Sequence, residues 1–323
     1  KQANLKVKTN SKKLAVNKKN KIAAKNPIVS VLVTTFNRKE LLIRCVKKIL
    51  MQSFKQFELI IIDDGSKDGS QEAVAKIKDE RIIYIYNKRN QGAEHGDRIH
   101  LKRFVYELSK GKYFVYVCDD DYWLSKNLLK FQVNLLENNP NAALVAGGQL
   151  SCFLNDGEKS PDLKFKDEIT VNYSNFIEKI TEKHTNLYNL TSGLPSGFFS
   201  SHQFLSHFSE DPIGYNFLTG ATLYNSEIFK RSKTFSSLKG SKWQAGYELK
   251  LGPGCFGSYI FINYPCLLGE IRQSNASFGR TQLEHYKDCL KSVNVAMENG
   301  FKYYKNDKEY LKYLKLCKQT TIK

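Results

Sequence analysis

The first 150 residues alternate between short apolar runs and longer stretches in which apolar residues recur at helical spacing. The apolar runs are rich in β-branched and aromatic residues: 28–36, 57–62, 81–86 and 113–117. Such runs are typical of strands that are buried on both faces. The stretches between them predict helices over about 41–50, 71–78 and 99–108. Alternating strands and helices predict an α/β fold with a mainly parallel sheet and right-handed crossovers.

The start of the first predicted helix carries a local signal. Asn37, with Glu40 three residues later, has the form of a capping box in which Asn replaces the usual Ser or Thr. We therefore expect the Asn37 side chain to accept a hydrogen bond from a backbone N–H in the first turn of that helix.

From about residue 150 the pattern becomes less regular. Residues 151–218 are rich in loop-forming residues. Ordered elements are expected again at 217–229, 243–252 and 258–265, and the tail from residue 281 has helical character. The second half therefore predicts the fold less specifically than the first.

Polar residues follow each of the four predicted strands. These clusters are Thr34–Arg38, Asp63–Ser66, Asn87–Arg98 and Asp119–Asp121. The carboxyl ends of parallel strands meet at one edge of a sheet, and ligands bind in the crevice beyond that edge. We therefore expect these four loops, distant in sequence, to form one ligand site.

The three consecutive carboxylates Asp119, Asp120 and Asp121 are the most specific of these clusters. Carboxylate oxygens at a strand end suit Mg²⁺ or Mn²⁺, which take one or two protein carboxylates together with substrate phosphates. Such an ion also neutralises a diphosphate leaving group. The alternative is that the acidic residues only end the strand as a turn or a helix cap.

Asp63 and Asp64 are weaker evidence, because the sequence DDGS is also ordinary turn chemistry. Beside a phosphate-neutralising metal site, a carboxylate here is able to accept the imide N–H of a uracil. Phe36 is placed to stack on that base, although an aromatic residue at a strand end is as often part of the core.

The charge of +18 is concentrated at the start of the chain, where residues 1–26 hold nine lysines and no acidic residue. We expect a flexible segment, either a solvated linker or a basic arm that attracts anionic membrane headgroups at about 1 kcal/mol per lysine. No RNP, zinc-finger or helix-turn-helix signature accompanies the charge, which argues against nucleic acid as the partner.

The seven cysteines are odd in number, scattered and never in CxxC spacing. This pattern argues against a disulfide framework and a zinc site and favours a reducing cytosol. No apolar run reaches the roughly 18 residues of a membrane span. We therefore expect a cytoplasmic protein, peripheral at the inner face of the plasma membrane if the basic arm binds there. Walker, dinucleotide-binding, GxSxG and HExxH motifs are absent, which removes the usual support for those enzyme classes.

The order and spacing of these motifs resemble a known family. The stretch PIVSVLVTTFNRKELLIRCVKKILMQSFKQFELIIIDDGSKDGS, followed by NQG and DDD, is similar to the N-terminal half of the family 2 glycosyltransferases. The resemblance spans roughly Pro27 to Leu136. Less specifically, 217–229 resembles the family's acceptor-side strand and helix, and 243–252 resembles its catalytic-base region.

The resemblance implies a GT-A (Rossmann-like) fold, a mainly parallel sheet flanked by helices with an acceptor-side subdomain and a C-terminal helical tail. We expect a basic flexible segment (1–26), a nucleotide-sugar-binding half (27–150), an acceptor-binding and catalytic-base half (151–282) and the tail (283–323).

The resemblance also implies roles for individual residues in the first half. Thr35, Phe36 and Arg38 would line the nucleotide pocket. Asp64, together with Asp63, would hold the base.

The acidic triad matches the family's DxD motif at Asp119 and Asp121, which are the expected metal ligands, Asp121 foremost. Asp119 or Asp120 would contact the ribose or the sugar.

Two departures from the family pattern affect the remaining roles. The family often has an arginine that contacts the pyrophosphate where this chain has Asp97, and Arg98 follows it as the nearest candidate. An acidic pair often precedes the aromatic of the base region, but here 244–246 reads QAG, which leaves Glu248 as the nearest carboxylate. An inverting transferase needs a carboxylate that takes the proton of the acceptor hydroxyl. We expect Glu248 in this role, with Asp211 in reserve; the alternative for Glu248 is a solvated position on a helix.

These features together predict an inverting glycosyltransferase that depends on Mn²⁺ or Mg²⁺. The expected donor is a nucleotide diphosphate-sugar, with UDP favoured. The expected acceptor is a hydroxyl of a growing surface glycan, such as a capsule polysaccharide, or of a lipid-linked glycan. The alternative is a catalytically inactive nucleotide- or glycan-binding module. A phosphoacceptor receiver domain is disfavoured because TTFNR stands where an acidic pair should follow the first strand.

Overall fold

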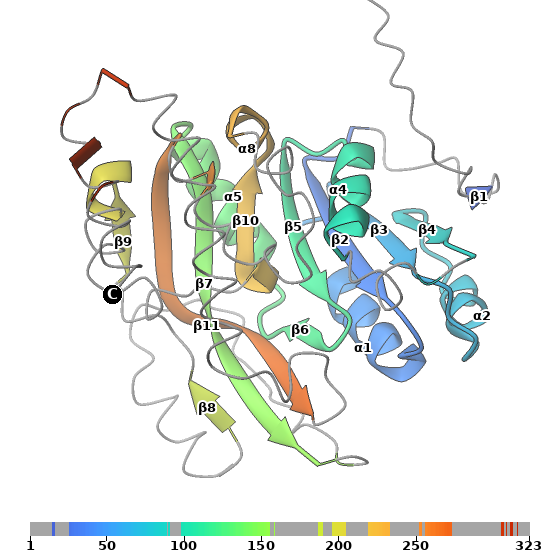
Figure 1. Ribbon diagram of the computed structural model, residues 1–323. Helices are drawn as coiled ribbons and strands as arrows, with labels where there is room; N and C mark the ends of the chain where they lie inside the picture. Colours follow the sequence, from blue (N-terminus) through green and yellow to red (C-terminus); the bar gives the residue numbers. More distant parts are fainter. Residues whose placement is uncertain are drawn as a thin grey trace, which may run out of the picture.

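The computed structural model contains one large mixed sheet with helices on both faces (Figure 1). It describes residues 15–16, 26–88, 90, 98–155, 158, 187–189, 196–204, 219–232, 252–253, 256–272, 305–306, 308, 311–312 and 315. The strand order is β1-β4-β3-β2-β5-β10-β7-β11-β6, with β8 paired to β7 and β9 paired to β11.

The four strands predicted in the first half are confirmed and pair in parallel. They are β2 (Val29–Thr35), β3 (Phe57–Asp63), β4 (Ile82–Tyr86) and β5 (Tyr113–Cys118). In space β2 lies between β3 and β5, and β4 lies outside β3. At the outer edge, β1 (Ala15–Val16) pairs antiparallel with β4. β1 falls within the segment that the sequence predicts as flexible.

The helices of the first half also follow the prediction, with one difference in length. They are α1 (Lys39–Leu50), α2 (Ser70–Ala75) and α4 (Arg98–Leu108). α2 ends three residues before the predicted limit. α1 and α2 each connect two neighbouring strands of the parallel sheet, whereas α4 connects β4 to β5, which lies beyond β3 and β2.

Beyond β5 the sheet contains both parallel and antiparallel pairs. β6 (Asp121–Trp123), β7 (Ala142–Leu154), β10 (Thr222–Asn225) and β11 (Ser258–Arg272) make up most of this part, with the short strands β8 (Leu187–Asn189) and β9 (Gly197–Phe199). β10 runs antiparallel between β5 and β7, whereas β11 is parallel to β7 and antiparallel to β6. The strand and helix expected at 217–229 are present as β10 and α8 (Ser226–Arg231), preceded by the 3₁₀ turn Thr219–Ala221.

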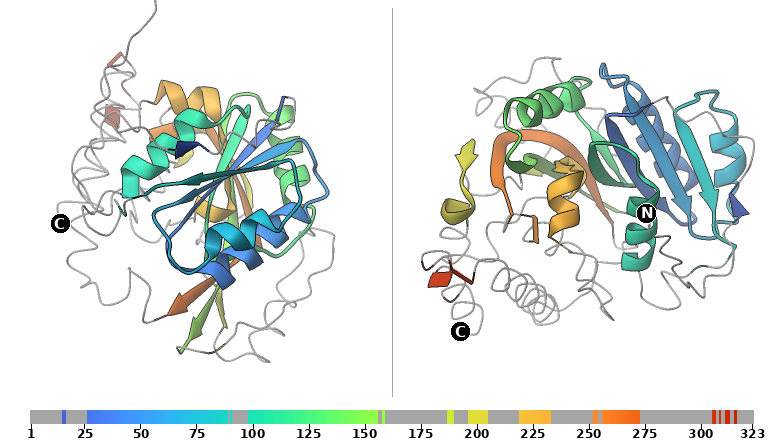
Figure 2. Two further views of the ribbon diagram at one scale, coloured as in Figure 1. Left: turned by 90° about the vertical axis from the view of Figure 1, so that its right-hand side faces the viewer. Right: turned by 90° about the horizontal axis from the view of Figure 1, so that it is seen from above.

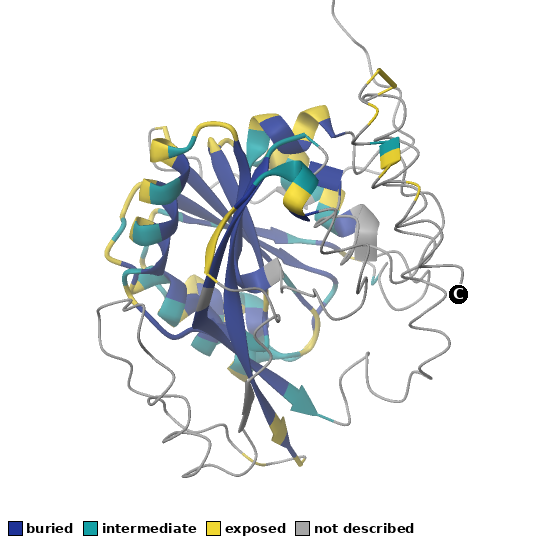
Figure 3. Ribbon diagram, turned by 90° about the vertical axis from the view of Figure 1, so that its left-hand side faces the viewer, coloured by how far each residue is buried: buried dark blue, intermediate teal, exposed yellow. Residues whose placement is uncertain are grey.

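Helices cover the sheet on both faces (Figure 2). α1, α2 and α5 (Leu128–Asn138) pack on one face, where their apolar residues join Val31 and Val33 in the main core cluster. α4 and α8 lie on the other face, where Phe114 is surrounded by Tyr106, Tyr224 and Phe229 at ring-centroid distances of 4.8 to 5.0 Å. The strands are therefore buried along most of their length (Figure 3), as the unbroken apolar runs predict.

The predicted capping box at Asn37 and Glu40 is wrong. Asn37 has a positive φ of 50°, and its side chain accepts a hydrogen bond from the backbone N–H of Lys67 at 2.8 Å. The N-terminal end of α1 is bound instead by Asp68, which accepts from the backbone N–H of Lys39 at 2.7 Å. The cap thus comes from the loop after β3, 29 residues away, and no local pattern could reveal it.

Among the described residues, no helix is long and apolar enough to cross a membrane. Within the same residues, the cysteines Cys45, Cys118, Cys152 and Cys266 are free thiols.

Replacement of Gly111 by alanine is expected to destabilise the fold by about 2 kcal/mol, since overpacking forces backbone shifts. A Cβ at Gly111 would lie 2.5 Å from both the backbone nitrogen of Ser30 and the carbonyl oxygen of Tyr113. The matched control is Gly197→Ala, because the nearest atom to a Cβ there is 3.9 Å away. Urea unfolding of both variants checks this expectation, and equal free energies of unfolding would contradict it.

Candidate active site

Three loops meet at the carboxyl edge of the parallel strands and bond to one another. The pairing register sets Thr35 beside Asp63, and Asp63 beside Tyr86. Thr35 accepts a hydrogen bond at its carbonyl from the backbone N–H of Asp64 at 2.9 Å. Its hydroxyl donates to Asp119 at 2.7 Å. The buried Thr35 therefore links the loops after β2, β3 and β5 to one another through hydrogen bonds.

Asp63 and Asp64 have different surroundings. Asp63 is fully buried; its carboxylate accepts hydrogen bonds from the backbone N–H of Ser66 at 2.7 Å and from the Tyr84 hydroxyl. Burial and the bond to Asp63 raise the pKa of Tyr84, so this hydroxyl stays protonated. Asp63 thus holds the loop after β3 in shape, and its expected share in the base contact stays a prediction.

Asp64 is oriented by a residue for which the sequence analysis proposes no role. The side-chain amide of Asn87 donates to Asp64 Oδ1 at 2.8 Å. Asn87 is the first residue after β4 and was recognisable only as one of a polar cluster. Phe36, which directly follows β2, is 39% exposed, so its ring is accessible at the same edge. The arrangement offers a fixed carboxylate and an exposed aromatic ring.

A positive charge lies among the three consecutive carboxylates. Arg38 Nη1 contacts Asp119 Oδ1 at 3.1 Å and Asp120 Oδ2 at 2.8 Å. Burial opposes the charge of Arg38, but the charges of Asp119 and Asp120 outweigh it, and the pKa of Arg38 is raised. Both oxygens of Asp119 are therefore occupied, one by Thr35 and the other by Arg38.

One arginine does not balance three carboxylates. Burial, followed by the charge of Asp120, raises the pKa of Asp119 to about 6 even though Arg38 and Thr35 act in the opposite direction. Desolvation and the charges of Asp120 and Asp119 raise the pKa of Asp121 well above its usual range. The cluster has an excess of negative charge that a further cation would relieve.

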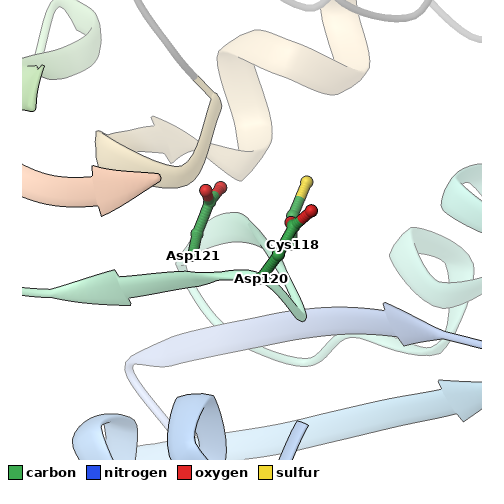
Figure 4. Close-up of side chains that lie close together, drawn as sticks. All are labelled: Cys118, Asp120 and Asp121. Carbon is green, nitrogen blue, oxygen red and sulfur yellow. The ribbon is translucent and has the colours of Figure 1, made fainter. Parts of the chain in front are cut away.

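Cys118, Asp120 and Asp121 form a group with metal-ligand spacing. One ligand atom from each lies within 4.8 Å of the others, and the three side chains project to the same side (Figure 4). Desolvation and the charge of Asp121 raise the pKa of the Cys118 thiol, which keeps it neutral and a weak ligand. The carboxylate oxygens fit the hard cations Mg²⁺ and Mn²⁺ better than zinc.

Two glycines pack closely against the Asp121 carboxylate. A Cβ at Gly269 of β11 would lie 2.9 Å from Asp121 Oδ1, and a Cβ at Gly220 would lie 3.1 Å from Asp121 Oδ2. Side chains at either position would press on the carboxylate. The carboxylate donor set fits a bound divalent ion.

The remaining predicted site residues are less defined. Arg98 begins α4, which follows the loop after β4, and its side chain lies outside the described part. Glu248, Asp211, Asp97 and the base region 243–252 lie outside the described residues, except for Gly252. The general base and the pyrophosphate contact therefore stay predictions.

The chain is similar to a known protein family. The family model described as glycosyl transferase family 2 matches residues 30–206, more than half of the chain. The match begins in β2 and ends after β9, so it includes the whole acidic edge described above.

Two curated relatives match the N-terminal part. The UDP-Glc:alpha-D-GlcNAc-diphosphoundecaprenol beta-1,3-glucosyltransferase WfaP of Escherichia coli is 34% identical over 110 residues, 34% of this chain and 41% of WfaP. The GalNAc(5)-diNAcBac-PP-undecaprenol beta-1,3-glucosyltransferase of Campylobacter jejuni is 30% identical over 165 residues, 49% of this chain and 52% of that protein. The matches thus span about half or less of these relatives' lengths.

A solved structure resembles the chain over more of its length. TarS of S. aureus, residues 1–349 in complex with UDP-GlcNAc, has a TM-score of 0.54 at 14% identity, covering 90% of this chain and 71% of TarS. At this identity the likeness concerns the fold alone. The expected GT-A fold, a curled and mainly parallel sheet flanked by helices, is confirmed.

Proposed function

This chain belongs to glycosyl transferase family 2, and we propose that it transfers a sugar from a UDP-sugar to a hydroxyl group of a lipid-linked glycan, with inversion at the sugar carbon. The observation that carries the proposal is the carboxyl edge of the sheet, where Thr35 and Arg38 link the loops that hold Asp64, Asp119 and Asp120 through hydrogen bonds. Asp121 follows directly in the chain. A nucleotide diphosphate needs a base contact, a ribose contact and a cation site, and we assign all three to residues of this edge.

Asp64 is the proposed base contact. Its carboxylate is fixed by Asn87 and is able to accept the imide N–H of uracil. Phe36 offers an exposed ring on which the base stacks. Cytosine has no imide N–H, so this arrangement favours UDP over CDP. Asp63 supports the loop through Ser66 and Tyr84.

Asp121 and Asp120 are the proposed metal ligands, because their carboxylates belong to the group with metal-ligand spacing, whereas Asp119 bonds to Thr35 and Arg38. A bound Mg²⁺ or Mn²⁺ would neutralise the diphosphate leaving group. Asp119 stays the candidate for a ribose contact, and it holds Arg38 in the site. The guanidinium of Arg38 adds positive charge where the diphosphate is expected, and Arg98 is the second candidate for this role.

Glu248 is the proposed general base. In an inverting transfer, a carboxylate on the sugar face opposite the leaving nucleotide takes the proton of the acceptor hydroxyl as the new bond forms. The proton goes to the carboxylate and the nucleotide diphosphate leaves with the electron pair of the broken bond. Glu248 is the nearest carboxylate in the base region of the sequence.

The proposed acceptor is a glycan linked to a polyprenyl diphosphate at a membrane surface. The name of WfaP describes a diphosphoundecaprenol-linked acceptor, and that of the Campylobacter relative describes a PP-undecaprenol-linked one. The lysine-rich residues 1–26 support a contact with anionic headgroups. A cytoplasmic enzyme at the inner face of the plasma membrane fits both points.

The function is tested by incubating the full chain with UDP-glucose or UDP-GlcNAc, Mn²⁺ and an undecaprenyl diphosphate-linked sugar. We expect a product one sugar longer and release of UDP. Binding of UDP without transfer to any acceptor offered would favour the inactive binding module.

The base contact has a separate test, in which the Asp64→Asn variant is titrated with UDP and with CDP. We expect the wild-type chain to bind UDP more tightly, and the variant to lose about tenfold to a hundredfold in UDP affinity, because a hydrogen bond to a charged group contributes about 1.5 to 3 kcal/mol. Glu80→Gln, a change at an exposed carboxylate, is the control. An unchanged preference for UDP in the Asp64 variant would exclude the proposed base contact.

A further inference from the structure

Gln149, on β7, lies close to the proposed metal ligand Asp121 although 28 residues separate them in sequence. The pairing register sets Ser151 of β7 beside Gly269 of β11, and Gly269 beside Asp121 of β6. These three residues therefore form one row across the sheet. Gln149 lies two residues before Ser151 and so has its side chain on the same face.

Gly269 lets the two side chains border one space. A Cβ at Gly269 would lie 2.5 Å from Gln149 Nε2 and 2.9 Å from Asp121 Oδ1. The amide nitrogen and the carboxylate oxygen thus both lie within 3 Å of the same point. Any larger residue at position 269 would separate them.

The Gln149 amide has bonding capacity left for a ligand. Its nitrogen donates to the Ser151 hydroxyl at 2.9 Å, which fixes the direction of the amide. A glutamine amide carries two N–H donors and a carbonyl oxygen that accepts. Within the described part of the chain, the bond to Ser151 is the one hydrogen bond of this side chain. Among the described residues, nothing bonds to the second N–H or to the carbonyl oxygen, although Gln149 is only 7% exposed.

Gln52 shows how a buried glutamine with a structural role differs. Its amide nitrogen donates to the carbonyl of Ser125 at 2.7 Å, and its amide oxygen accepts from the backbone N–H of Leu129 at 3.1 Å. Both ends of that amide are bound to backbone. Gln149 has no comparable arrangement among the described residues, since its single bond goes to a side chain.

We propose that Gln149 is a specificity-determining residue that hydrogen-bonds a hydroxyl group of the sugar being transferred. The inference rests on the proposed function, in which the diphosphate lies at Asp120 and Asp121 and the sugar is attached to it. A hydroxyl group both donates and accepts, and so does an amide. An uncharged amide also adds no repulsion beside the carboxylates, whereas a further acidic residue would.

The test compares Gln149→Ala with the wild-type chain on UDP-glucose, its C4 epimer UDP-galactose, and UDP-GlcNAc. A site that hydrogen-bonds a substrate hydroxyl discriminates strongly against a donor that cannot make the bond. We expect the variant to lose about tenfold to a hundredfold in kcat/KM for the preferred sugar and most of the discrimination against the epimer. The affinity for UDP itself, which lacks the sugar, is expected to change less than about twofold.

Gln52→Ala is the matched control, because it removes a buried amide that has a structural role. We expect it to lower the melting temperature without changing the ratio of kcat/KM values between the sugars. Unchanged discrimination in Gln149→Ala, or a loss of UDP affinity and stability together as for a packing residue, would overturn the inference. A wild-type chain that binds no UDP would instead overturn the proposed function, and this inference with it.

Discussion

Asp121→Asn is expected to lower sugar transfer by about a thousandfold, which corresponds to a loss of about 4 kcal/mol of transition-state stabilisation. Among the described residues, Asp121 forms the one group with metal-ligand spacing, together with Asp120 and Cys118. Asparagine keeps the shape of the side chain but removes the charge that we propose for binding a divalent cation. Initial rates of UDP release at saturating donor measure the effect.

The same substitution is expected to leave the fold intact or to stabilise it when no metal is bound. The pKa of Asp121 is raised by desolvation and by the charges of Asp120 and Asp119. Removal of one charge therefore relieves repulsion that the folded chain otherwise bears. The melting temperature in EDTA should be unchanged or higher than that of the wild-type chain. This result separates a functional carboxylate from a structural one.

A control for the loss of one negative charge is Glu107→Gln. Glu107 is exposed on α4 and pairs only weakly with Arg103 across one helical turn, at 2.8 Å with both side chains more than half exposed. We expect this variant to keep wild-type transfer rates. If Asp121→Asn also kept them, the acidic triad would not be the cation site.

Glu270→Ala is expected to destabilise the fold by about 3 kcal/mol. The Glu270 side chain is fully buried between two arginines: it accepts a hydrogen bond from Arg44 of α1 and contacts Arg272 Nη2 at 2.8 Å. Removal of the carboxylate leaves two guanidinium groups without the charge that balances them, which costs far more than an exposed pair. The partial exposure of Arg44, at 30%, keeps the expected value at the lower end of the range for buried pairs.

Glu137→Ala is the matched control for this prediction. Glu137 pairs with Lys112 at 2.7 Å, but both side chains are largely exposed, at 43% and 58%. Such a pair contributes at most about 1 kcal/mol. Urea unfolding followed by circular dichroism measures both variants. Equal destabilisation of the two variants would mean that the buried Glu270 carboxylate contributes no more to the free energy of unfolding than the exposed Glu137 carboxylate.

The first half of the sheet was predictable because its strands are buried on both faces. Val31, Leu32 and Val33 belong to an apolar run that is typical of a central strand, and all three are buried. Once four such strands are parallel, topology alone brings the loops after them to one edge. The hydrogen bond from Thr35 to Asp119, between residues 84 positions apart, follows from that topology.

The second half was predicted less completely, for physical reasons. The strand expected at 258–265 continues to Arg272 because β11 passes Pro265 with register shifts on either side of it. Proline has no backbone N–H to donate to a neighbouring strand, so its presence in the sequence predicts the end of a strand. β7 was missed for a related reason, since Gly147 and Gly148 weaken the strand signal while Gly147 makes room for Cys266.

The roles of single residues depended on contacts that the sequence does not show. Arg38 was expected in the nucleotide pocket, and its bridge to Asp119 and Asp120 is a further role that follows from the meeting of two loops. Asp63 resembled Asp64 in sequence, but the contact with Tyr84 gives it a different environment. Gln149 carried no signal at all, because its place beside Asp121 depends on a glycine in a third strand.

The most direct test of the central claim is a calorimetric titration of UDP into the full wild-type chain, with Mn²⁺ and again with EDTA. The account predicts binding with Mn²⁺ and an affinity at least about tenfold lower in EDTA, because the diphosphate and the carboxylates of the triad need a cation between them. No binding of UDP with Mn²⁺, or the same affinity in EDTA, would contradict the assignment of this edge as a metal-dependent nucleotide-sugar site.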